Sequence, residues 1–365
     1  MSTVILPAGK RRIRKAAWPP GGRPSSARTP LLVSSAALVV VAIVGTAVGP
    51  ANIPLTEVVG VLLSHLPLVH YHSSATPIEQ AVVWEIRLPR VALAALVGSM
   101  LAAGGASYQG VFRNPLADPY LLGVAAGAGL GATIVIVNVA GGGQSEVLPI
   151  AAFVAGSAAV AVTYLLGASV GERSSGAAIV LAGVAVAALL TAAQTYLQQQ
   201  HAPELQQVYA WILGSLSVAT WSDVWLILPY VAVSAVVLVA HRRMLDVLRV
   251  GEDEANSLGV HAARVRLIVV AAATLGTAAA VSVSGLIGFV GIIVPHAVRL
   301  TTNASYRVVL PVSMIAGAAF LIVADLAART IEAPGEIPIG VVTAFVGAPF
   351  FLLVLRSRRV RQSVL

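Results

Sequence analysis

Histidines are the side chains in this sequence whose spacing best suits metal or haem binding. His65, His70 and His72 fall within one stretch of the chain. In an extended strand, residues two apart point to the same side, so the rings of His70 and His72 would face one ligand together. The stretch could hold a relay for a metal or haem group, but an ordinary polar loop is the favoured interpretation. His296, which follows Pro295 in an apolar segment, is expected to be packed and hydrogen bonded.

Composition excludes most catalytic chemistry. The chain has no cysteine, so it has no disulfide, thiolate metal site or catalytic thiol. Its only lysines are Lys10 and Lys15, so it lacks the phosphate-binding G-x-x-x-x-G-K-[ST] loop, and any energy from ATP must come from a partner. The apolar segments hold no paired carboxylates and no nucleophile beside a base; Asp325 is their one candidate acid. We expect a protein that is not an enzyme and binds no cofactor of its own.

The elements that carry these residues are predicted to be membrane spans. Apolar residues make up 58% of the chain, and its mean hydropathy is +0.88. A helix that crosses roughly 30 Å of hydrocarbon at about 1.5 Å per residue needs about 20 mostly apolar residues. We predict an all-α integral membrane protein with about ten transmembrane helices. They are expected near residues 31–49, 91–112, 119–138, 148–170, 177–197, 223–241, 264–283, 286–300, 308–326 and 339–355.

The distribution of basic residues orients these spans. An even number of spans puts both basic ends of the chain on one side. Threading the connections places 20 of the 23 lysines and arginines on that side, which the positive-inside rule identifies as the cytoplasm. The net charge of +8 therefore reflects orientation, and without a basic soluble domain no nucleic-acid binding is expected. The exceptions are Arg87, Arg90 and Arg329, which fall on the outer side.

The chain is predicted to have a tail and one membrane domain. Residues 1–30 are rich in Pro, Gly, Ser and Arg, which predicts a disordered basic cytoplasmic tail. A cleaved signal is not favoured, because the apolar run starts late and no small-residue cleavage site follows it. Residues 31–365 are expected to form the membrane domain. Within it, Gly123, Gly127 and Gly131 make a groove on one helix face, which favours packing inside the chain over a dimer seam.

Two connections on the cytoplasmic side contain strong turn signals. In residues 113–119, two prolines interrupt the helix and Asp118 is placed to cap the next one. This pattern predicts either a capped turn or a constriction whose side chains project into a pathway. In residues 249–260, three acids start a short helix that Gly259 can end. This second pattern predicts a surface helix that offers Leu258 and Val260 to a partner or, alternatively, a solvated loop helix.

Several motifs together resemble one family. They are RLPR at 87–90, QG at 109–110 with RNPLADPYLLGVAAGAGLGA at 113–132, WILGSL at 211–216, GLIGFVGIIVPHAVRL at 285–300 and EIPIGVVTAFVGAPFFLLVLR at 336–356. In this order, from about residue 35 to the C-terminus, the chain is similar to the permease subunits of iron-siderophore, haem and vitamin B12 ABC importers, the type II importers.

The resemblance implies a homodimeric permease in the plasma (inner) membrane, surrounded by lipid, with a pathway between the two copies. Two ATPase subunits would bind ATP and Mg on the cytoplasmic side, and a periplasmic or lipid-anchored substrate-binding protein would dock outside. The expected cargo is a ferric siderophore, with cobalamin or haem as alternatives; the sequence does not identify it, nor whether the cell has an outer membrane. A gradient-driven secondary transporter or channel is the alternative class, disfavoured by the scarcity of acids in the spans.

The resemblance also assigns roles to residues. Arg87, Arg90 and Arg329 would meet carboxylates of the binding protein; the alternative is pairing within this chain with Glu85, Asp325, Glu332 or Glu336. The expected gate residues are Asn114, Leu116, Ser174 and Ser175. The expected ATPase coupling helix comprises Glu252, Glu254, Ala255, Leu258, Gly259 and Val260. The candidate hinges are Gly285, Gly288, Gly291 and Pro295, for which close packing is the alternative.

Overall fold

The computed structural model describes residues 28–49, 53–65, 73–139, 143, 145–169, 176–302 and 305–356, and these ranges contain helices but no strand. The all-α prediction is therefore confirmed for the described residues. The longer helices are α1 (Arg28–Ala47), α4 (Leu88–Val111), α5 (Val124–Asn138), α6 (Val147–Ser169), α7 (Gly176–Gln200), α9 (Trp221–Leu248), α11 (Ala262–Ser284), α12 (Val290–Thr301), α13 (Tyr306–Thr330) and α14 (Ile339–Arg356). The short ones are α2 (Leu55–Ser64), α3 (Pro77–Ala81), η1 (Val82–Arg87), η2 (Pro119–Leu122), η4 (Ala202–Glu204), α8 (Leu205–Ile212) and α10 (Glu252–Ser257).

Each predicted span coincides with one of the ten longer helices, but not all of them are long enough to cross a bilayer alone. Seven helical segments of the described chain have the required length and hydropathy, whereas α5, α12 and α14 fall among the shorter apolar helices. The 12 residues of α12 cover only about 18 Å at about 1.5 Å per residue. A membrane protein with several spanning helices is supported, and the count of ten stays a prediction.

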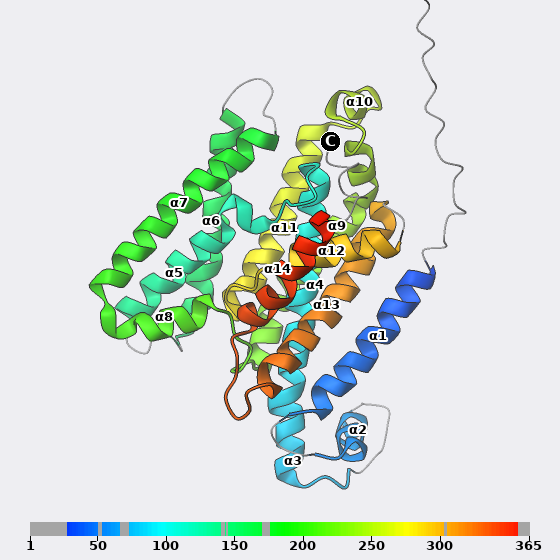
Figure 1. Cartoon of the computed structure of the whole chain (residues 1–365), viewed down its shortest axis with the longest axis vertical. Helices are drawn as coiled ribbons and strands as arrows, with labels where there is room; N and C mark the ends of the chain where they lie inside the picture. Colours follow the sequence, from blue (N-terminus) through cyan, green and yellow to red (C-terminus); the bar gives the residue numbers. More distant parts are fainter. Residues whose placement is uncertain are drawn as a thin grey trace, which may run out of the picture.

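Helix α4 is the centre of the bundle. It packs against α9, α11, α12 and α13 (Figure 1), and 19 of its 24 residues are buried. By contrast, only two of the 20 residues of α1 are buried, because this helix lies at the edge and packs mainly on α13. Helix α4 is therefore the element whose sequence is most constrained by its neighbours.

Glycines let the backbones of α4 and its neighbours touch. A Cβ atom on Gly98 would lie 2.2 Å from the carbonyl oxygen of Gly317 in α13, and one on Gly105 would lie 1.9 Å from that of Gly291 in α12. Both distances are far inside van der Waals contact, so only glycine fits these crossings. In lipid, the hydrophobic effect does not drive helices together, so the dispersion contacts made at such close approach hold them in place.

A second group of helices lies beside this centre. Helices α5, α6, α7 and α8 form it, and α11 joins it to the rest of the bundle (Figure 1). Gly127 and Gly131 face the backbone carbonyls of Ala155 and Ala151 in α6, where a Cβ atom would come within 2.5 Å of each oxygen. At Gly127 and Gly131 the predicted groove is thus filled by a helix of the same chain, as the intramolecular interpretation requires, whereas Gly123 precedes α5 with a φ of +92° and does not belong to the helix.

The helix that contains the RLPR motif starts earlier than the sequence predicts. Helices α3, η1 and α4 run on without a break from Pro77 to Val111, so Arg87 and Arg90 lie on a helix and not in a connection. The segment η1 is a wide π turn, in which the N–H of Leu88 bonds the carbonyl of Val83. This wide turn comes just before Pro89, whose ring would clash with the preceding turn of a regular α-helix.

The two ends of the bundle are distinct. Helices α2 and α3 lie at one end, called here the α2 end, and α10 lies at the other, the α10 end (Figure 1). Helix α1 is described from Arg28, three residues before the predicted span. The remainder of the predicted tail lies outside the described residues.

The glycine contact between α4 and α12 gives the first prediction. In Gly105→Ala, the new methyl group would press on the backbone of α12, which cannot move aside as a side chain can. We expect the free energy of unfolding in detergent to fall by about 1–3 kcal/mol, as for other overpacked cores. Thermal unfolding of the purified protein measures it. Gly288→Ala is the matched control, because no atom lies within 4 Å of the point that its new methyl group would occupy; equal losses in both variants would contradict the close-contact argument.

Candidate functional sites at the two ends of the bundle

The three arginines predicted to face outward are buried at the α2 end. Arg87, Arg90 and Arg329 are 3%, 7% and 3% exposed. Arg90 holds two carboxylates: its Nε lies 2.9 Å from Asp325 Oδ1, and its Nη1 and Nη2 donate to Glu336 Oε1 and Oε2 at 2.8 and 3.0 Å. Arg329 also faces Asp325, with its Nε 3.5 Å from Oδ2. Pairing with carboxylates offsets the cost of burying these charges.

Arg87 and Arg329 also cap the end of α1. The Nη1 atom of Arg87 donates to the carbonyls of Thr46 and Ala47 at 3.2 and 2.6 Å, and Nη2 of Arg329 donates to that of Gly45. These carbonyls belong to the last turn of the helix, where no intrahelical donor remains. Positive groups also suit the negative end of the helix dipole. The cluster of Arg87, Arg90, Arg329, Asp325 and Glu336, called here the arginine cluster, therefore anchors α1 to α4 and α13.

The sequence left two interpretations of these arginines open, and the structure bears on one. Pairing within the chain occurs with Asp325 and Glu336, two of the four acids that the sequence offers as partners. Glu85 and Glu332 are exposed and form no ion pair with the arginines among the pairs of the described chain. Docking of a partner onto the arginines stays a prediction.

At the α10 end, the connection between α4 and α5 is a rigid turn. Asn114 Oδ1 accepts a hydrogen bond from the N–H of Leu116 at 2.9 Å, and Asp118 Oδ1 caps η2 by accepting from the N–H of Tyr120 at 2.9 Å. The predicted cap is thus present. Packing close to Gly291 removes the Asp118 carboxylate from water and raises its pKa to about 6. Asn114 and Leu116 are exposed, with the leucine 43% accessible.

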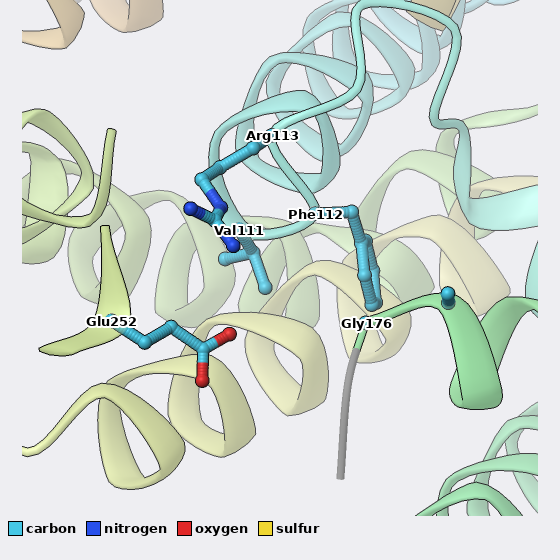
Figure 2. A pocket seen from close by; sticks show the side chains of 6 residues that line it. Val111, Phe112, Arg113, Gly176 and Glu252 are labelled. Atoms are coloured by element: carbon cyan, nitrogen blue, oxygen red, sulfur yellow. The ribbon is translucent and has the colours of Figure 1, made fainter. Parts of the chain in front are cut away.

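A cavity of about 470 Å³ opens beside this turn. It is lined by Val111 at the end of α4, by Phe112 and Arg113 after it, by Gly176 and Ala177 in α7, and by Glu252 at the start of α10 (Figure 2). Figure 2 shows the side chains of Arg113 and Glu252 directed toward the same space from opposite sides. Ser174 and Ser175, the other predicted gate residues, lie outside the described residues.

The predicted short surface helix is present as α10. Its cap follows the expected pattern, because Gly259 adopts a φ of +80° and the N–H of Val260 reaches back to the carbonyl of Ala255 at 2.9 Å. Ala255 is fully buried and fixes the helix to the bundle, whereas Leu258 is 68% exposed. Glu254 is exposed, and Glu252 is held by an ion pair with the buried Arg266 of α11. The helix thus presents an apolar side chain on a fixed support.

Gly285 and Gly288 lie at the break between α11 and α12, whereas the other two candidate hinges, Gly291 and Pro295, lie within α12. Gly285 ends α11 at a φ of +68°, and a Cβ atom there would lie 2.1 Å from the carbonyl oxygen of Trp211. Gly291 and Pro295 are buried, whereas a Cβ atom on Gly288 would have no neighbouring atom of the described chain within 4 Å. Phe289 has a φ of +69°, an unfavourable value for a side chain of its size. Close packing accounts for Gly285 and Gly291, and a hinge role stays a prediction.

The histidines do not assemble a metal centre in the described chain, where no group of three or more potential ligands occurs. His65 stacks on Trp84 with ring centroids 3.7 Å apart, and its Nδ1 lies 2.9 Å from the carbonyl of Val61. His70 and His72 lie outside the described residues. His296 is packed beside Phe350 as expected, but its Nε2 is buried with no hydrogen-bond partner in the described chain.

One polar network was not predicted. At the α10 end, Arg299 of α12 donates to the side chain of Gln109 in α4 and, at 3.1 Å, to the hydroxyl of Tyr306 in α13. Gln109 in turn donates to the carbonyl of Gly291 at 3.0 Å. The network ties three helices together. Its sequence signal was Gln109 within an otherwise apolar helix, because a buried amide needs partners.

Comparison with known proteins identifies the family. Residues 37–357 match the FecCD transport family. The cobalamin import system permease protein BtuC of Halobacterium salinarum is 39% identical, over 93% of this chain and 99% of the relative. The hemin transport system permease protein HmuU of Yersinia pestis is 40% identical over 77% and 85%, and the Fe(3+)-citrate import system permease protein YfmE of Bacillus subtilis is 34% identical over 91% and 96%.

A solved structure agrees with this assignment. An ABC transporter of the metal-chelate type, in an inward-facing conformation, superposes with a TM-score of 0.78 and 29% identity, over 90% of this chain and all of that chain. The motifs that suggested an importer permease lie within the matched residues. The chain therefore belongs to the FecCD transport family of ABC transporter permeases.

Proposed function

We propose that this chain is the transmembrane permease subunit of an ATP-driven importer that carries an iron chelate of the ferric siderophore type. The observation that carries the proposal is the match to FecCD permeases along nearly the whole chain, with relatives named for Fe(3+)-citrate, hemin and cobalamin import. Cobalamin is the second candidate, since the relative named for it aligns over 93% of this chain. Haem is the third.

The proposed assembly contains two copies of this chain, two ATPase subunits and a substrate-binding protein, periplasmic or lipid-anchored. The pathway lies between the two copies and opens alternately to each side of the plasma membrane. The α10 end faces the cytoplasm, together with both termini, and the α2 end faces outward. ATP and Mg bind to the partner ATPase, so the chain itself acts as a transport subunit and not as an enzyme.

Helix α10 is the proposed docking element for the ATPase. A side chain that carries force between subunits must be exposed on a support that does not yield. Leu258 meets this requirement, because it is 68% exposed while Ala255, one turn earlier, is fully buried. The ion pair from Glu252 to Arg266 ties the start of the same helix to α11. Movement of the ATPase would therefore pass through α10 into α11.

The gate is proposed to lie at the α4–α5 turn and in the loop before α7, which contains Ser174 and Ser175. The turn is stiff, since Asn114 and Asp118 both hold backbone N–H groups. The cavity between Arg113 and Glu252 lies beside it (Figure 2). Motion of α10 would thus change the space next to the gate directly.

The arginine cluster is proposed to receive the substrate-binding protein, through carboxylates on the partner. The three arginines are buried and face two carboxylates of this chain, so the cluster keeps one excess positive charge, which would serve mainly to orient the encounter and raise its rate. The same arginines hold α1, α4 and α13 together. Their replacement therefore affects the permease before any partner arrives.

Transport itself gives the broadest test. Uptake of labelled ferric siderophore, cobalamin and haem is measured in cells with and without this chain, before and after ATP depletion. We expect ferric siderophore uptake to depend on both the chain and ATP. Dependence of cobalamin or haem uptake instead would change the cargo and keep the importer class. Uptake that survives ATP depletion but stops when the ion gradient is dissipated would overturn the proposed mechanism.

The coupling role of α10 is tested with Leu258→Asp. A charge at the exposed apolar contact should weaken ATPase association by about tenfold or more, as expected for a central contact. Co-purification and titration with the ATPase subunits measure the loss. Ser257→Asp places the same charge one residue earlier, outside the apolar contact, and should bind nearly normally. Equal binding by both variants and the wild type would dismiss the assignment.

The structural role of Arg90 is tested by Arg90→Ala. The variant leaves the carboxylate of Asp325, which is 1% exposed, without its main partner. We expect the free energy of unfolding to fall by about 3–5 kcal/mol, the usual cost of breaking a buried pair. Arg307→Ala is the control, since Arg307 is 62% exposed and lies 3.9 Å from Asp246, and it should cost less than about 1 kcal/mol. Thermal unfolding in detergent compares the two.

A further inference from the structure

Arg90 holds two carboxylates that differ sharply in accessibility. Asp325, on α13, is 1% exposed and binds Nε and Nη2. Glu336, in the connection between α13 and α14, is 34% exposed and binds Nη1 and Nη2 with both oxygens. The first partner belongs to the buried core of the cluster. The second reaches it from the surface of the α2 end.

We propose that Glu336 occupies, in the undocked permease, the place on Arg90 that a carboxylate of the substrate-binding protein takes on docking. Glu336 would then be an internal competitor that keeps the docking site closed. This inference rests on the proposed function, since it requires a binding protein that presents acids to the α2 end. The new element is that Glu336 already occupies the docking position on Arg90 and must leave it before the binding protein can bind there.

The chemistry of the exchange favours a carboxylate as the incoming group. A guanidinium can present two planar pairs of N–H groups to carboxylates: here Nε and Nη2 face Asp325, while Nη1 and Nη2 serve Glu336 in the bidentate form. An incoming Asp or Glu side chain can match that geometry. The exchange leaves the charge of the cluster unchanged, while Asp325 keeps Arg90 in place. Glu336 can turn to water because a third of its side chain is already exposed.

The residues that follow Glu336 connect it to the inside of the bundle. The N–H of Ile337 donates to the carbonyl of Ala328 at 2.9 Å. The N–H groups of Ile339 and Gly340 donate to the carbonyls of Gly214 and Leu213 at 3.2 and 3.0 Å. A displacement of Glu336 therefore pulls on the turn that precedes α9.

The turn that precedes α9 packs against the break between α11 and α12. The N–H of Ser215 donates to the carbonyl of Ser284 at 3.0 Å, and Gly285 lies against the backbone of Trp211 and Gly214. Two backbone hydrogen-bonded steps thus separate Glu336 from the break that contains Gly285 and Gly288. Release of Glu336 on docking would reach this break without any movement of the arginines.

The test compares Glu336→Gln with the matched control Glu332→Gln. Both variants remove one negative charge from the same connection, but only Glu336 is paired to Arg90. The permease with its ATPase subunits is placed in lipid nanodiscs, and association of the importer's fluorescently labelled substrate-binding protein is followed by stopped flow. We expect association about fivefold faster with Glu336→Gln than with the wild type, and within about twofold for Glu332→Gln.

The outcomes separate the inference from the proposed function. If the wild type binds and both variants associate equally fast, Glu336 is no competitor and the inference fails while the importer assignment stands. If the binding protein fails to associate with the wild type and with both variants, the docking part of the proposed function fails, and the inference fails with it. Slower association with Glu336→Gln alone would also overturn the inference, since the side chain would then assist docking.

Hydrogen exchange of the full-length permease provides a second readout that needs no partner. If Glu336 holds the connection in place, Glu336→Gln should speed exchange at the amides of Ile337, Ile339 and Gly340 by about tenfold. Glu332→Gln should leave these rates within about twofold. Equal rates in the two variants would show that the pair with Arg90 does not restrain the path to the helix break.

Discussion

Backbone contact between α4 and its neighbours is the constraint on which the rest of the structure depends. At Gly98 and Gly105 the helices come so close that a single methyl group has no room. Lipid offers no gain from burying apolar side chains between helices, so close approach and many small dispersion contacts must hold the bundle together. These crossings fix the positions of α12 and α13. The two helices in turn position the arginine cluster at one end of the bundle and the polar network of Arg299 at the other.

The arginine cluster shows how charge is kept inside such a bundle. Isolated ionised groups are costly to bury, and a buried pair often adds little net stability. Here the guanidinium groups serve a second purpose, because Arg87 and Arg329 satisfy carbonyls that end α1. A peripheral helix with few buried residues thereby gains a fixed end. The same cluster offers a charged, geometrically defined site at the α2 end, so one group of side chains supports both the architecture and the proposed docking.

Local patterns in the sequence predicted much of this arrangement. Hydropathy placed all ten longer helices, the turn residues placed the cap at Asp118, and Gly259 ended α10 as expected. Burial of the arginines could not be predicted from the charge pattern, since that pattern reports the side of the membrane and not whether a helix packs over a residue. The sequence did not predict that α3 and α4 form one continuous helix, because Pro89 normally interrupts a regular α-helix. Here the π turn of η1 accommodates the proline. The hydrogen-bond partners of Gln109 could not be predicted either, because they lie on a helix that is distant in sequence and meets α4 only in the folded bundle.

The two caps of α1 also set an order in biosynthesis. Arg87 lies about 40 residues after the carbonyls it binds, whereas Arg329 lies 284 residues after Gly45. At roughly 5–20 residues per second of translation, the second cap is synthesised roughly ten to fifty seconds after the first. The early cap can join α1 to α4 while most of the chain is still unmade. The late one closes the bundle only when α13 arrives, so α1 is among the last of the described helices to be fully secured.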